Sequence, residues 1–447
     1  MGMSQGVSRP QRVAVVGSGV AGLGAAWLLG KGHTVTLLEQ ADYVGGHSNT
    51  VDVPSDPRDI AVDTGFIVYN ERNYPNLTRL FAHLAVPTAA SDMSFAVSLR
   101  NGTLEYAGTN LAGLFAQPGN LVDRRFWRML VDLRRFYRDA TALRREAARD
   151  GLTLGQLLAR HRYSAAFIDD HLLPMAGAIW SATAAEMADY PAVAFLDFCL
   201  NHGLVQLRDR PQWRTVLGGS REYVRRLLAD LPGAVRLASP VVAVERISQG
   251  VQLCLADGSR ETFDQVVLAT HADQALQLLV APDARERSAL GAFRYSCNRA
   301  VLHEDATLMP QRRAAWASWN HLGEVGRQPS VTYWMNNLQP LATRRNLFVT
   351  LNPVHEPDAA MVHRELEYHH PLFDAGALDA QRTLAGLQGA GGVWFCGSYF
   401  GYGFHEDALE SGLWVAEALG GVARPWAWSA QDGRTALAGV EAAPVAA

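Results

Sequence analysis

The chain has 447 residues, of which 48% are hydrophobic and 19% are charged, and its formal net charge is −4. This length allows two or three lobes around a large core, and the slightly acidic balance argues against a nucleic-acid-binding protein. No apolar run reaches membrane-spanning length, and residues 1–11 are too short and polar for a signal peptide. The four cysteines form no CxxC pair, which favours a reducing, cytoplasmic location.

The first predicted unit is a strand, a glycine-rich turn and a helix near the N-terminus. The apolar run Val13–Val16 is followed by Gly17-x-Gly19-x-x-Gly22 and by a helical pattern through Leu29. In such a motif the first glycine permits a tight turn, the second admits a pyrophosphate, and the third lets helix and strand pack closely. The free amides at the helix start also favour phosphate.

A second predicted strand, Thr34–Leu38, ends at Glu39, whose carboxylate is suitably placed for a ribose hydroxyl. Strand, helix, second strand and acidic residue in this order predict a dinucleotide site, and a glycine turn without a ligand is the weaker alternative. The predicted cofactor contacts of this unit are Gly17, Ser18, Gly19, Ala21, Gly22, Glu39 and Gln40.

The next two segments favour a flavin over a nicotinamide. Asp42–Thr50 resembles the second glycine pair of the amine-oxidase and phytoene-desaturase flavoprotein superfamily, with His47 where an arginine often follows the glycines. Val62–Phe66 resembles the stretch that turns back toward the flavin in these proteins. The alternative is a pair of ordinary turns. The resemblance implies FAD, with contacts from Gly45, Gly46, His47, Ser48, Gly65 and Phe66.

The middle of the chain is predicted to return to the cofactor domain. Gly218–Ser220, before an amphipathic helical pattern, marks the usual re-entry point of the superfamily. Pro240–Thr270 alternates apolar and polar residues and ends in an apolar strand, Phe263–Ala269, which predicts a β-meander. By resemblance, Val242 lies near the adenine and Thr270 contacts the cofactor.

The C-terminal segment resembles the flavin-facing end of monoamine-oxidase-like proteins. A strand at Val393–Cys396 meets Gly397, and an aromatic-rich loop precedes a helix that starts near His405. In that family the helix start points at the flavin pyrimidine, where its dipole stabilises the anion of the reduced flavin. The backbone amide of His405 is the candidate contact. The segment's implied cofactor contacts are Gly397, Ser398, Phe404, His405 and Asp407.

The chain departs from the amine-oxidase pattern in three ways. Phe404 replaces a tyrosine of the aromatic cage, and Ser398-Tyr399 replaces the usual acidic residue. Lys31 is the only lysine, so the chain has none to hold beside flavin N5, as amine oxidases commonly do. The amine-oxidase mechanism would therefore lack its usual lysine beside the flavin.

Candidate catalytic bases lie on the predicted cofactor-facing loop: His405, Glu406 and Tyr399. A helix-start histidine that contributes only its backbone is the alternative for His405. An apolar substrate also needs an apolar pocket, although buried aromatic residues are more often simple core. The aromatic candidates are Trp180, Trp316, Trp319, Tyr333, Trp334, Tyr399 and Tyr402. The polar cluster His303–Asp305 lacks metal-ligand spacing, so we predict no metal.

Four segments in combination resemble a bacterial family of amine-oxidase-type flavoproteins, and the resemblance covers about residues 10–425. Members are often linked to cyclopropane-synthase-like methyltransferases that modify membrane fatty acids. The resemblance implies FAD-dependent desaturation of a methyl-branched unsaturated fatty acyl chain to a conjugated diene, on the furan fatty acid route, with a methyltransferase as partner. An amine or phytoene-type polyene oxidoreductase and a non-catalytic flavoprotein partner of the methyltransferase are the alternatives. The segments are residues 298–310, 315–320, 331–339 and 401–407.

The segment Asp123–Asp150 carries nine arginines and five acidic residues. A basic amphipathic helix can lie on an anionic membrane, here the inner membrane surface, and the alternative is a core-facing stripe with solvated charges. The apolar stripe at helical spacing consists of Phe126, Leu130, Leu133, Tyr137 and Ala140.

The expected architecture is an α/β (α+β) fold, with a Rossmann-like FAD-binding domain of the amine oxidase and glutathione reductase type and an inserted mixed substrate domain. The FAD domain is expected to be discontinuous, because its predicted motifs are separated along the chain. The predicted boundaries are 10–75, 211–290 and 388–425 for the FAD domain, 76–210 and 291–387 for the substrate domain, and 426–447 for a flexible tail.

Overall fold

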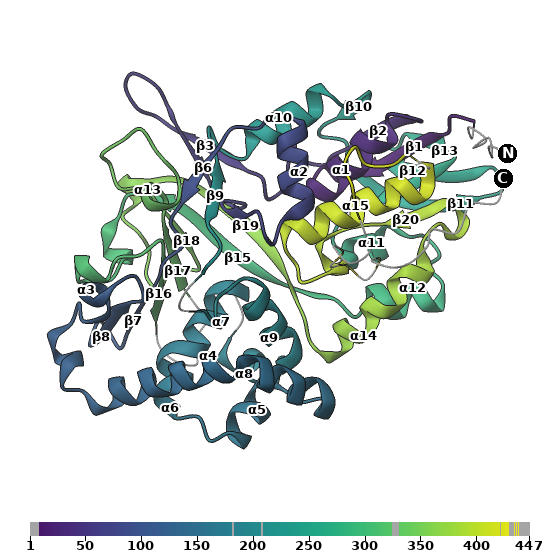
Figure 1. Ribbon diagram of the computed structural model, residues 1–447. Helices are drawn as coiled ribbons and strands as arrows, with labels where there is room; N and C mark the ends of the chain where they lie inside the picture. The colour runs from purple at the N-terminus through teal and green to yellow at the C-terminus, as the bar shows by residue number, and fades with distance from the viewer. Residues whose placement is uncertain are drawn as a thin grey trace.

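The computed structural model describes residues 9–180, 183–206, 209–323, 330–420 and 422–428, together with residues 433, 435 and 437. Figure 1 shows a sheet covered by helices α1 and α15 on one side of the molecule and a helical region with a second sheet on the other. Two long strands, β15 (Arg294–His303) and β19 (Val362–Leu372), run between these regions.

The first sheet has five strands in the order β10-β2-β1-β14-β20, and every neighbouring pair is parallel. Its central strands are apolar on both faces, because α1 and α15 cover one face and the antiparallel strands of residues 241–263 pack on the other. The predicted second strand and the helix through Leu29 are confirmed. The elements are β1 (Arg12–Val16), α1 (Val20–Leu29), β2 (Thr34–Leu38), β10 (Gly233–Arg236), β14 (Gln265–Leu268), β20 (Val393–Phe395) and α15 (His405–Gly420).

The predicted meander forms a separate three-stranded antiparallel sheet of β11 (Val241–Ile247), β12 (Gly250–Leu255) and β13 (Arg260–Phe263). The expected single strand Phe263–Ala269 is wrong, because the chain changes sheet at Asp264. There the backbone N–H of Asp264 donates to the carbonyl oxygen of Arg12 (2.9 Å), and its Oδ2 accepts from the Arg12 N–H (2.7 Å). Two short strands therefore replace one.

A seven-stranded sheet in the order β19-β15-β18-β17-β16-β7-β8 forms the core of the second region. Its neighbouring strands are antiparallel except for the parallel pair β16 and β7. The mixed helix-and-sheet fold predicted from the sequence is thus confirmed. The remaining strands of this sheet are β7 (Phe95–Leu99), β8 (Leu104–Ala107), β16 (Trp319–Gly323), β17 (Ser330–Trp334) and β18 (Phe348–Leu351).

The rest of the described chain forms further helices and short strands, of which α4 (Arg124–Asp150) is the longest helix. The helix predicted after the Gly218–Ser220 turn is α10 (Arg221–Ala229). The others are β3 (Thr50–Val53), β4 (Ile60–Asp63), β5 (Tyr69–Asn70), α2 (Pro75–His83), β6 (Thr88–Ser91), α3 (Leu111–Leu114), α4 (Arg124–Asp150), α5 (Leu154–Arg160), α6 (Ala165–Phe167), α7 (Leu173–Trp180), α8 (Ala184–Asp189), α9 (Ala192–Asn201), β9 (Trp213–Val216), α11 (Ala272–Leu278), α12 (Ala284–Leu290), α13 (Met335–Leu338) and α14 (Ala375–Leu384).

Helix α4 confirms the long amphipathic helix and shows which way its apolar stripe faces. The Asp123 side chain accepts from the Arg125 N–H (2.8 Å) at the start, and Gly151 ends the helix in a left-handed conformation (φ 63°). Phe126 and Ala140 are buried, and the helix packs on α6 and α9. The stripe therefore faces the core.

The predicted flexible tail is partly packed on the protein. The ring of Trp426 stacks on Trp27, with centroids 6.1 Å apart, and Leu437 is fully buried. The Oγ1 of Thr435 donates to Glu410 (2.9 Å). These contacts contradict a loose tail at the positions concerned, and the rest of that segment lies outside the described residues.

Among the described residues, no helix is both long enough and apolar enough to cross a bilayer.

Candidate active site

The glycine-rich turn at the carboxyl end of β1 leaves an open space beside the start of α1. Gly17 has φ 101°, and a Cβ atom there would lie 2.8 Å from the carbonyl oxygen of Ala269. A Cβ atom on Gly22 would overlap the carbonyl oxygen of Gly17. At Gly19, in contrast, nothing lies within 4 Å of the Cβ position. An anionic group can therefore approach the backbone amides at this point.

The Glu39 carboxylate lies beside this turn, at the end of β2. Its Oε2 accepts from the N–H (2.8 Å) and the Oγ (2.6 Å) of Ser18, and its Oε1 accepts from the Ala41 N–H (2.9 Å). Gln40, which follows, is exposed. The carboxylate is thus held next to the open space, where a ribose contact requires it.

The second glycine pair lies directly against the first motif. Gly45 and Gly46 have φ values of 123° and 57°, which favour glycine. The Gly45 N–H donates to the Ser18 carbonyl oxygen (3.1 Å), and a Cβ atom on Gly46 would lie 3.2 Å from the Cα of Gly19. The two turns therefore border the same open space, although 26 residues separate Gly19 from Gly45 along the chain.

His47 brings an unpaired polar atom to this region. Its Nε2 is buried and has no hydrogen-bond partner among the described residues. Burial, followed by the nearby His370, holds the pKa of His47 well below its usual value. A neutral imidazole still offers one N–H donor, so His47 suits a phosphate contact in place of arginine. Its carbonyl oxygen accepts from the Phe66 N–H (2.7 Å), which places the predicted Gly65–Phe66 turn next to it.

His370, which sequence reasoning did not single out, lies beside His47 and contacts Asn298. The ring centroid of His370 is 5.5 Å from that of His47, and its Nδ1 lies 3.2 Å from the Nδ2 of Asn298. Burial lowers the pKa of His370 to about 4. His370 and Asn298 occupy neighbouring strands, β19 and β15. No local motif marks His370, because the contact joins segments more than 300 residues apart.

His405 is the first residue of α15, as predicted, and its ring faces the glycine turns. The ring stacks on Phe66 with centroids 3.9 Å apart, and its Nε2 lies 2.7 Å from the Tyr223 hydroxyl and 3.4 Å from the Ser48 Oγ. Burial lowers the pKa of His405 to about 3. The imidazole is therefore neutral and a weak proton acceptor at neutral pH, which fits an orienting role better than that of a general base.

The two acidic residues that follow His405 point elsewhere. The Oε1 of Glu406 accepts from the backbone N–H of Asn76 (2.8 Å), and its Oε2 accepts from that of Leu77 (3.0 Å). Burial raises the pKa of Glu406 to about 7, against the effect of these hydrogen bonds. The Oδ2 of Asp407 accepts from the N–H of Phe404 (2.9 Å). Glu406 thus caps α2, and Asp407 folds the aromatic loop onto the start of α15.

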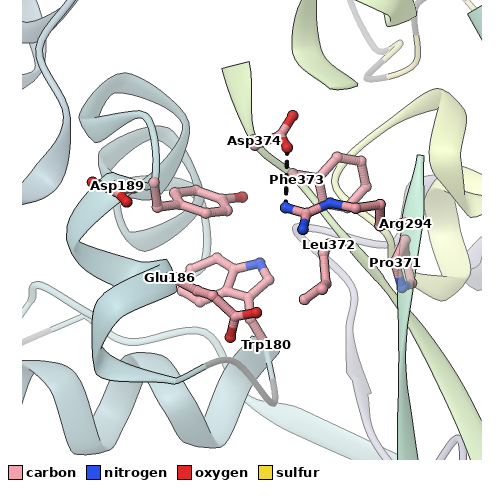
Figure 2. Close-up of a pocket in the computed structure, with 9 residues that line it drawn as sticks. Trp180, Glu186, Asp189, Arg294, Pro371, Leu372, Phe373 and Asp374 are labelled. Carbon is pink, nitrogen blue, oxygen red and sulfur yellow. Dashed lines mark hydrogen bonds and ion pairs between the residues drawn. The ribbon is translucent and has the colours of Figure 1, made fainter. Parts of the chain in front are cut away.

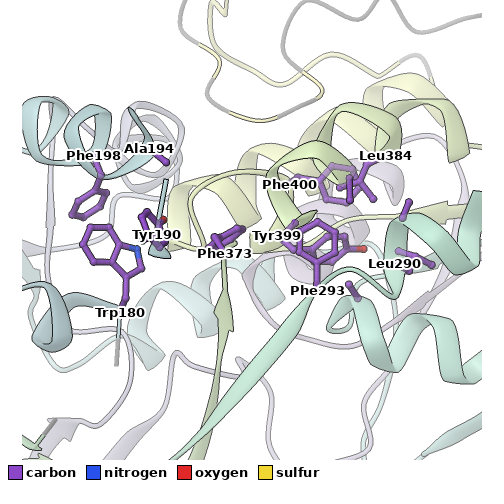
Figure 3. Packing of buried hydrophobic residues seen from close by; sticks show 14 of the residues in the cluster. Trp180, Tyr190, Ala194, Phe198, Leu290, Phe293, Phe373, Leu384, Tyr399 and Phe400 are labelled. Carbon is purple, nitrogen blue, oxygen red and sulfur yellow. The ribbon is translucent and has the colours of Figure 1, made fainter. Parts of the chain in front are cut away.

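Tyr399, the third base candidate, lies in the hydrophobic core. Figure 3 shows it beside Phe293 and Phe400, whose ring centroids are 5.3 Å and 4.8 Å away. Its hydroxyl has no partner among the described residues, and burial raises its pKa well above the usual value. A buried tyrosine of this kind is a poor base. Its contacts place it in the packing behind the loop.

The remaining predicted cofactor contacts are divided between two places. A Cβ atom on Gly397 would lie 3.3 Å from the carbonyl oxygen of Thr270, so the ends of β20 and β14 meet. The carbonyl oxygen of Ser398 accepts from the Gly403 N–H (3.2 Å) and shapes the loop. Val242 lies on β11 in the separate three-stranded sheet, and 51% of it is exposed.

An aromatic wall connects the start of α15 to a cavity. Phe404 stacks on Phe198 at 4.7 Å, Phe198 lies 4.8 Å from Trp180, and Trp180 lies 5.4 Å from Tyr190 (centroid distances). The cavity measures about 110 Å³ and is bordered by an Arg294–Asp374 ion pair (3.2 Å), drawn in Figure 2. Its lining residues are Trp180, Glu186, Asp189, Tyr190, Arg294, Pro371, Leu372, Phe373 and Asp374.

Sequence reasoning selected Trp180 but missed Phe373 and Arg294 of the cavity and Phe198 of the aromatic wall. None of the three belongs to a local motif, since Phe198 comes from α9, Phe373 follows β19 and Arg294 starts β15. The predicted aromatics that pack with the seven-stranded sheet instead are Trp316, Trp319, Tyr333 and Trp334. Tyr402 lies in the loop before α15 and is half-buried.

Lys31 lies far from these residues in the fold. It follows the end of α1 that is opposite to the glycine turn, and its Nζ pairs with Asp230 at 3.3 Å. On the outer face of β15 and β19, Cys297, Glu367 and His369 bring potential ligand atoms within 4.8 Å of one another. Cys297 and Glu367 are exposed, and we assign no ion to this group.

Comparisons with known proteins agree with this geometry. Residues 20–303, more than half of the chain, match the family described as flavin containing amine oxidoreductase. Over 47 residues the chain is 60% identical to an L-amino-acid oxidase of Pseudechis australis, a match that spans 10% of this chain and only 9% of that relative.

Two solved structures have the same fold. Putrescine oxidase bound to putrescine has a TM-score of 0.66 at 17% identity, over 91% of this chain and 98% of that one. A CLA-producing fatty acid isomerase from P. acnes has a TM-score of 0.63 at 15% identity, over 91% and 97%.

The residues around the glycine turns fit the cofactor of this family. The open space beside Gly19 and the helix start suit a diphosphate, Glu39 suits a ribose, and the unpaired Nε2 of His47 offers a further donor. The chain belongs to the flavin containing amine oxidoreductase family, and its cofactor is FAD.

Proposed function

We propose that this oxidoreductase desaturates a lipid substrate, a methyl-branched unsaturated fatty acyl chain that becomes a conjugated diene on the furan fatty acid route. The observation that supports the proposal is the aromatic wall from the cavity to the start of α15. Trp180, Tyr190 and Phe373 are each at most 6% exposed, so one side of the cavity has a buried aromatic lining. Such a lining suits an acyl chain, which offers no polar group for recognition.

The cavity and the loop before α15 are in direct contact. A Cβ atom on Gly403 would lie 2.9 Å from the ring of Phe373, so no side chain fits between them. Phe404 extends the wall to the residue that precedes α15. A substrate along this wall would meet apolar surface up to the helix start, where the resemblance places the flavin ring. The shared architecture of a fatty acid isomerase supports the proposal through the fold alone.

Bound FAD would accept the hydride that desaturation removes from the acyl chain, and the proton lost from the neighbouring carbon would pass to bulk water. The chain's own residues would bind the cofactor through the amides of the glycine turns, Glu39 and His47. The aromatic wall would exclude water from the acyl chain, and the neutral His405 would keep added charge away from an apolar substrate. The family lysine is missing, since the only lysine, Lys31, pairs with Asp230. This loss favours a substrate other than an amine.

Anaerobic mixing with a methyl-branched unsaturated phospholipid tests the proposal. We expect the yellow flavin absorbance to bleach and a conjugated diene to appear in the lipid extract. A straight-chain saturated phospholipid is the negative control. Replacing Phe198 with alanine opens the wall and should slow bleaching without loss of bound FAD. Bleaching by amines or amino acids but by no lipid would overturn the proposal.

A second candidate, amine oxidation, is supported by the charges around the cavity. Glu186, Asp189 and Asp374 outnumber Arg294 there, and a cationic group would be attracted to this edge. Putrescine and L-amino acids in the same anaerobic assay separate the two candidates. If no compound bleaches the flavin and the protein co-purifies with a fatty-acyl methyltransferase, a non-catalytic role as its partner is supported instead.

A further inference from the structure

Large hydrophobic side chains are exposed together at one corner of the molecule. Five of the thirteen such side chains among the described residues lie between residues 111 and 131, and they include the most exposed ones. These five residues, with Arg124, Arg128 and Arg134, are named the α3–α4 surface here. Their exposed fractions are 74% for Leu111, 53% for Leu121, 85% for Val122, 46% for Trp127 and 60% for Val131.

The five side chains form one continuous surface. The indole N–H of Trp127 donates to the carbonyl oxygen of Leu121 (2.9 Å), which holds the ring against the turn before α4. The Phe115 ring lies 5.9 Å from that of Trp127 and one helical turn after Leu111. Val131 lies one turn after Trp127 on the same face of α4. A contiguous exposed apolar surface with a polar rim is typical of a site that binds a protein or a membrane.

The net charge around this apolar surface is positive. Arg124, Arg128 and Arg134 are exposed on the outward side of α4, at spacings that place them beside Trp127 and Val131. Arg124 and Arg134 form no ion pair with any residue that the structure describes. The nearby Asp132 is buried and turned inward, where it accepts from the Ser164 N–H (3.0 Å). Arg128 pairs with Asp132 (3.4 Å), and Asp123, beside Val122, is exposed and accepts from the Arg125 N–H (2.8 Å), so the surface has three arginines against one exposed carboxylate.

We propose that the α3–α4 surface docks on an anionic membrane. Apolar side chains with a tryptophan can enter the interfacial layer, while the arginines bind lipid phosphates. A second copy of the chain is a poorer partner, because two such basic surfaces repel each other. This site differs from the apolar stripe of α4, which faces the core. The proposal does not depend on the reaction, because docking requires no turnover.

Co-sedimentation of the FAD-loaded protein with lipid vesicles tests the docking. We expect binding to vesicles of mixed phosphatidylglycerol and phosphatidylcholine, weaker binding at high salt, and little binding to phosphatidylcholine alone. The double variant Val122→Ser/Val131→Ser should weaken binding about tenfold or more, because it removes two exposed apolar side chains. Arg124→Glu/Arg134→Glu should do the same on anionic vesicles.

Matched controls use exposed residues elsewhere on the protein. Val280→Ser/Val354→Ser removes two side chains that are 56% and 49% exposed, and Arg382→Glu reverses a charge on α14. These variants should bind like the wild type. No sedimentation with anionic vesicles, or equal binding by all variants, would overturn the proposal. A wild-type dimer that the Val122 and Val131 variant dissociates would also overturn it, by showing an interface between copies.

Discussion

A Cβ atom on Gly412 in α15 would overlap the carbonyl oxygen of Ala21 in α1. The last helix of the fold therefore meets the first at backbone distance, in the first turn of α1 and within the glycine-rich motif itself. This contact fixes where α15 begins relative to the open space beside Gly19. Residues almost 400 positions apart are aligned in this way to form one cofactor site.

Replacing Gly412 with alanine should separate α1 and α15. Overpacking of this kind costs about 1–3 kcal/mol, which exceeds the gain in helix propensity of about 1 kcal/mol from glycine to alanine. We expect a lower free energy of unfolding by urea and weaker retention of FAD. Gly386→Ala is the control, because nothing lies within 4 Å of its Cβ position. Equal stability of both variants would contradict the close contact.

The glycine turn predicts opposite results for two neighbouring substitutions. Gly19→Ala places a methyl group in open space, so the apoprotein should unfold like the wild type while FAD affinity falls at least about tenfold. Gly22→Ala meets the carbonyl oxygen of Gly17 and should lower the stability of the apoprotein itself. Urea unfolding without cofactor and FAD titration measure the two effects. An unstable Gly19→Ala apoprotein would show that the space is not open.

Local sequence was sufficient to predict the first βαβ unit and the start of α15. At Gly17 and Gly22 the backbone geometry excludes a side chain, so the spacing of glycines reports the structure directly. It was not sufficient for the directions of the side chains at the start of α15. Consecutive helical side chains point about 100° apart, so His405, Glu406 and Asp407 reach three different partners.

Most residues that line the cavity could not be predicted from the sequence, for a different reason. Trp180, Arg294 and Phe373 meet only after two lobes have packed, and no short motif connects them. The unpaired Nε2 of His47 likewise depends on its enclosed surroundings rather than on its neighbours in sequence. Backbone motifs could therefore be predicted, whereas side-chain direction and long-range contacts could not.

Tyr399→Phe should have no effect on flavin reduction. Its hydroxyl is buried without a partner among the described residues, so its removal should leave stability unchanged or raise it by up to about 1 kcal/mol. Tyr223→Phe is the matched comparison, because the Tyr223 hydroxyl lies 2.7 Å from the Nε2 of His405. Loss of this hydroxyl should destabilise the start of α15. A large fall in the reduction rate of Tyr399→Phe would restore it as a base.

Stability should depend on pH through histidines that burial keeps neutral. Burial lowers the pKa of His405 to about 3 and those of His370 and His303 to about 4, from 6.5. Between these values the unfolded chain binds more protons than the folded one, so stability rises with pH. We expect the histidine contribution to the free energy of unfolding to be fully present above pH 6.5 and to fall toward pH 4. Urea titrations across this range would contradict the assignment if they gave a flat profile.

Glu406→Gln distinguishes a structural carboxylate from a catalytic base. The substitution replaces one acceptor oxygen at the start of α2 by an amide donor, which should cost about 1–3 kcal/mol of stability. The reduction rate of folded enzyme should stay within about twofold, whereas loss of a general base would lower it about 10²–10⁴-fold.

The Glu406→Gln variant should also differ from the wild type in how its stability depends on pH. The wild-type pKa of Glu406 is raised from 4.5 to about 7, so its contribution to stability is present below pH 4.5 and is lost as pH rises through 7. Glu406→Gln should therefore show a steeper rise of stability between these values, because this opposing term is absent. Glu245→Gln, an exposed carboxylate on β11, should leave stability, rate and pH profile unchanged. A slow but stable Glu406→Gln enzyme would assign the proton transfer to this residue.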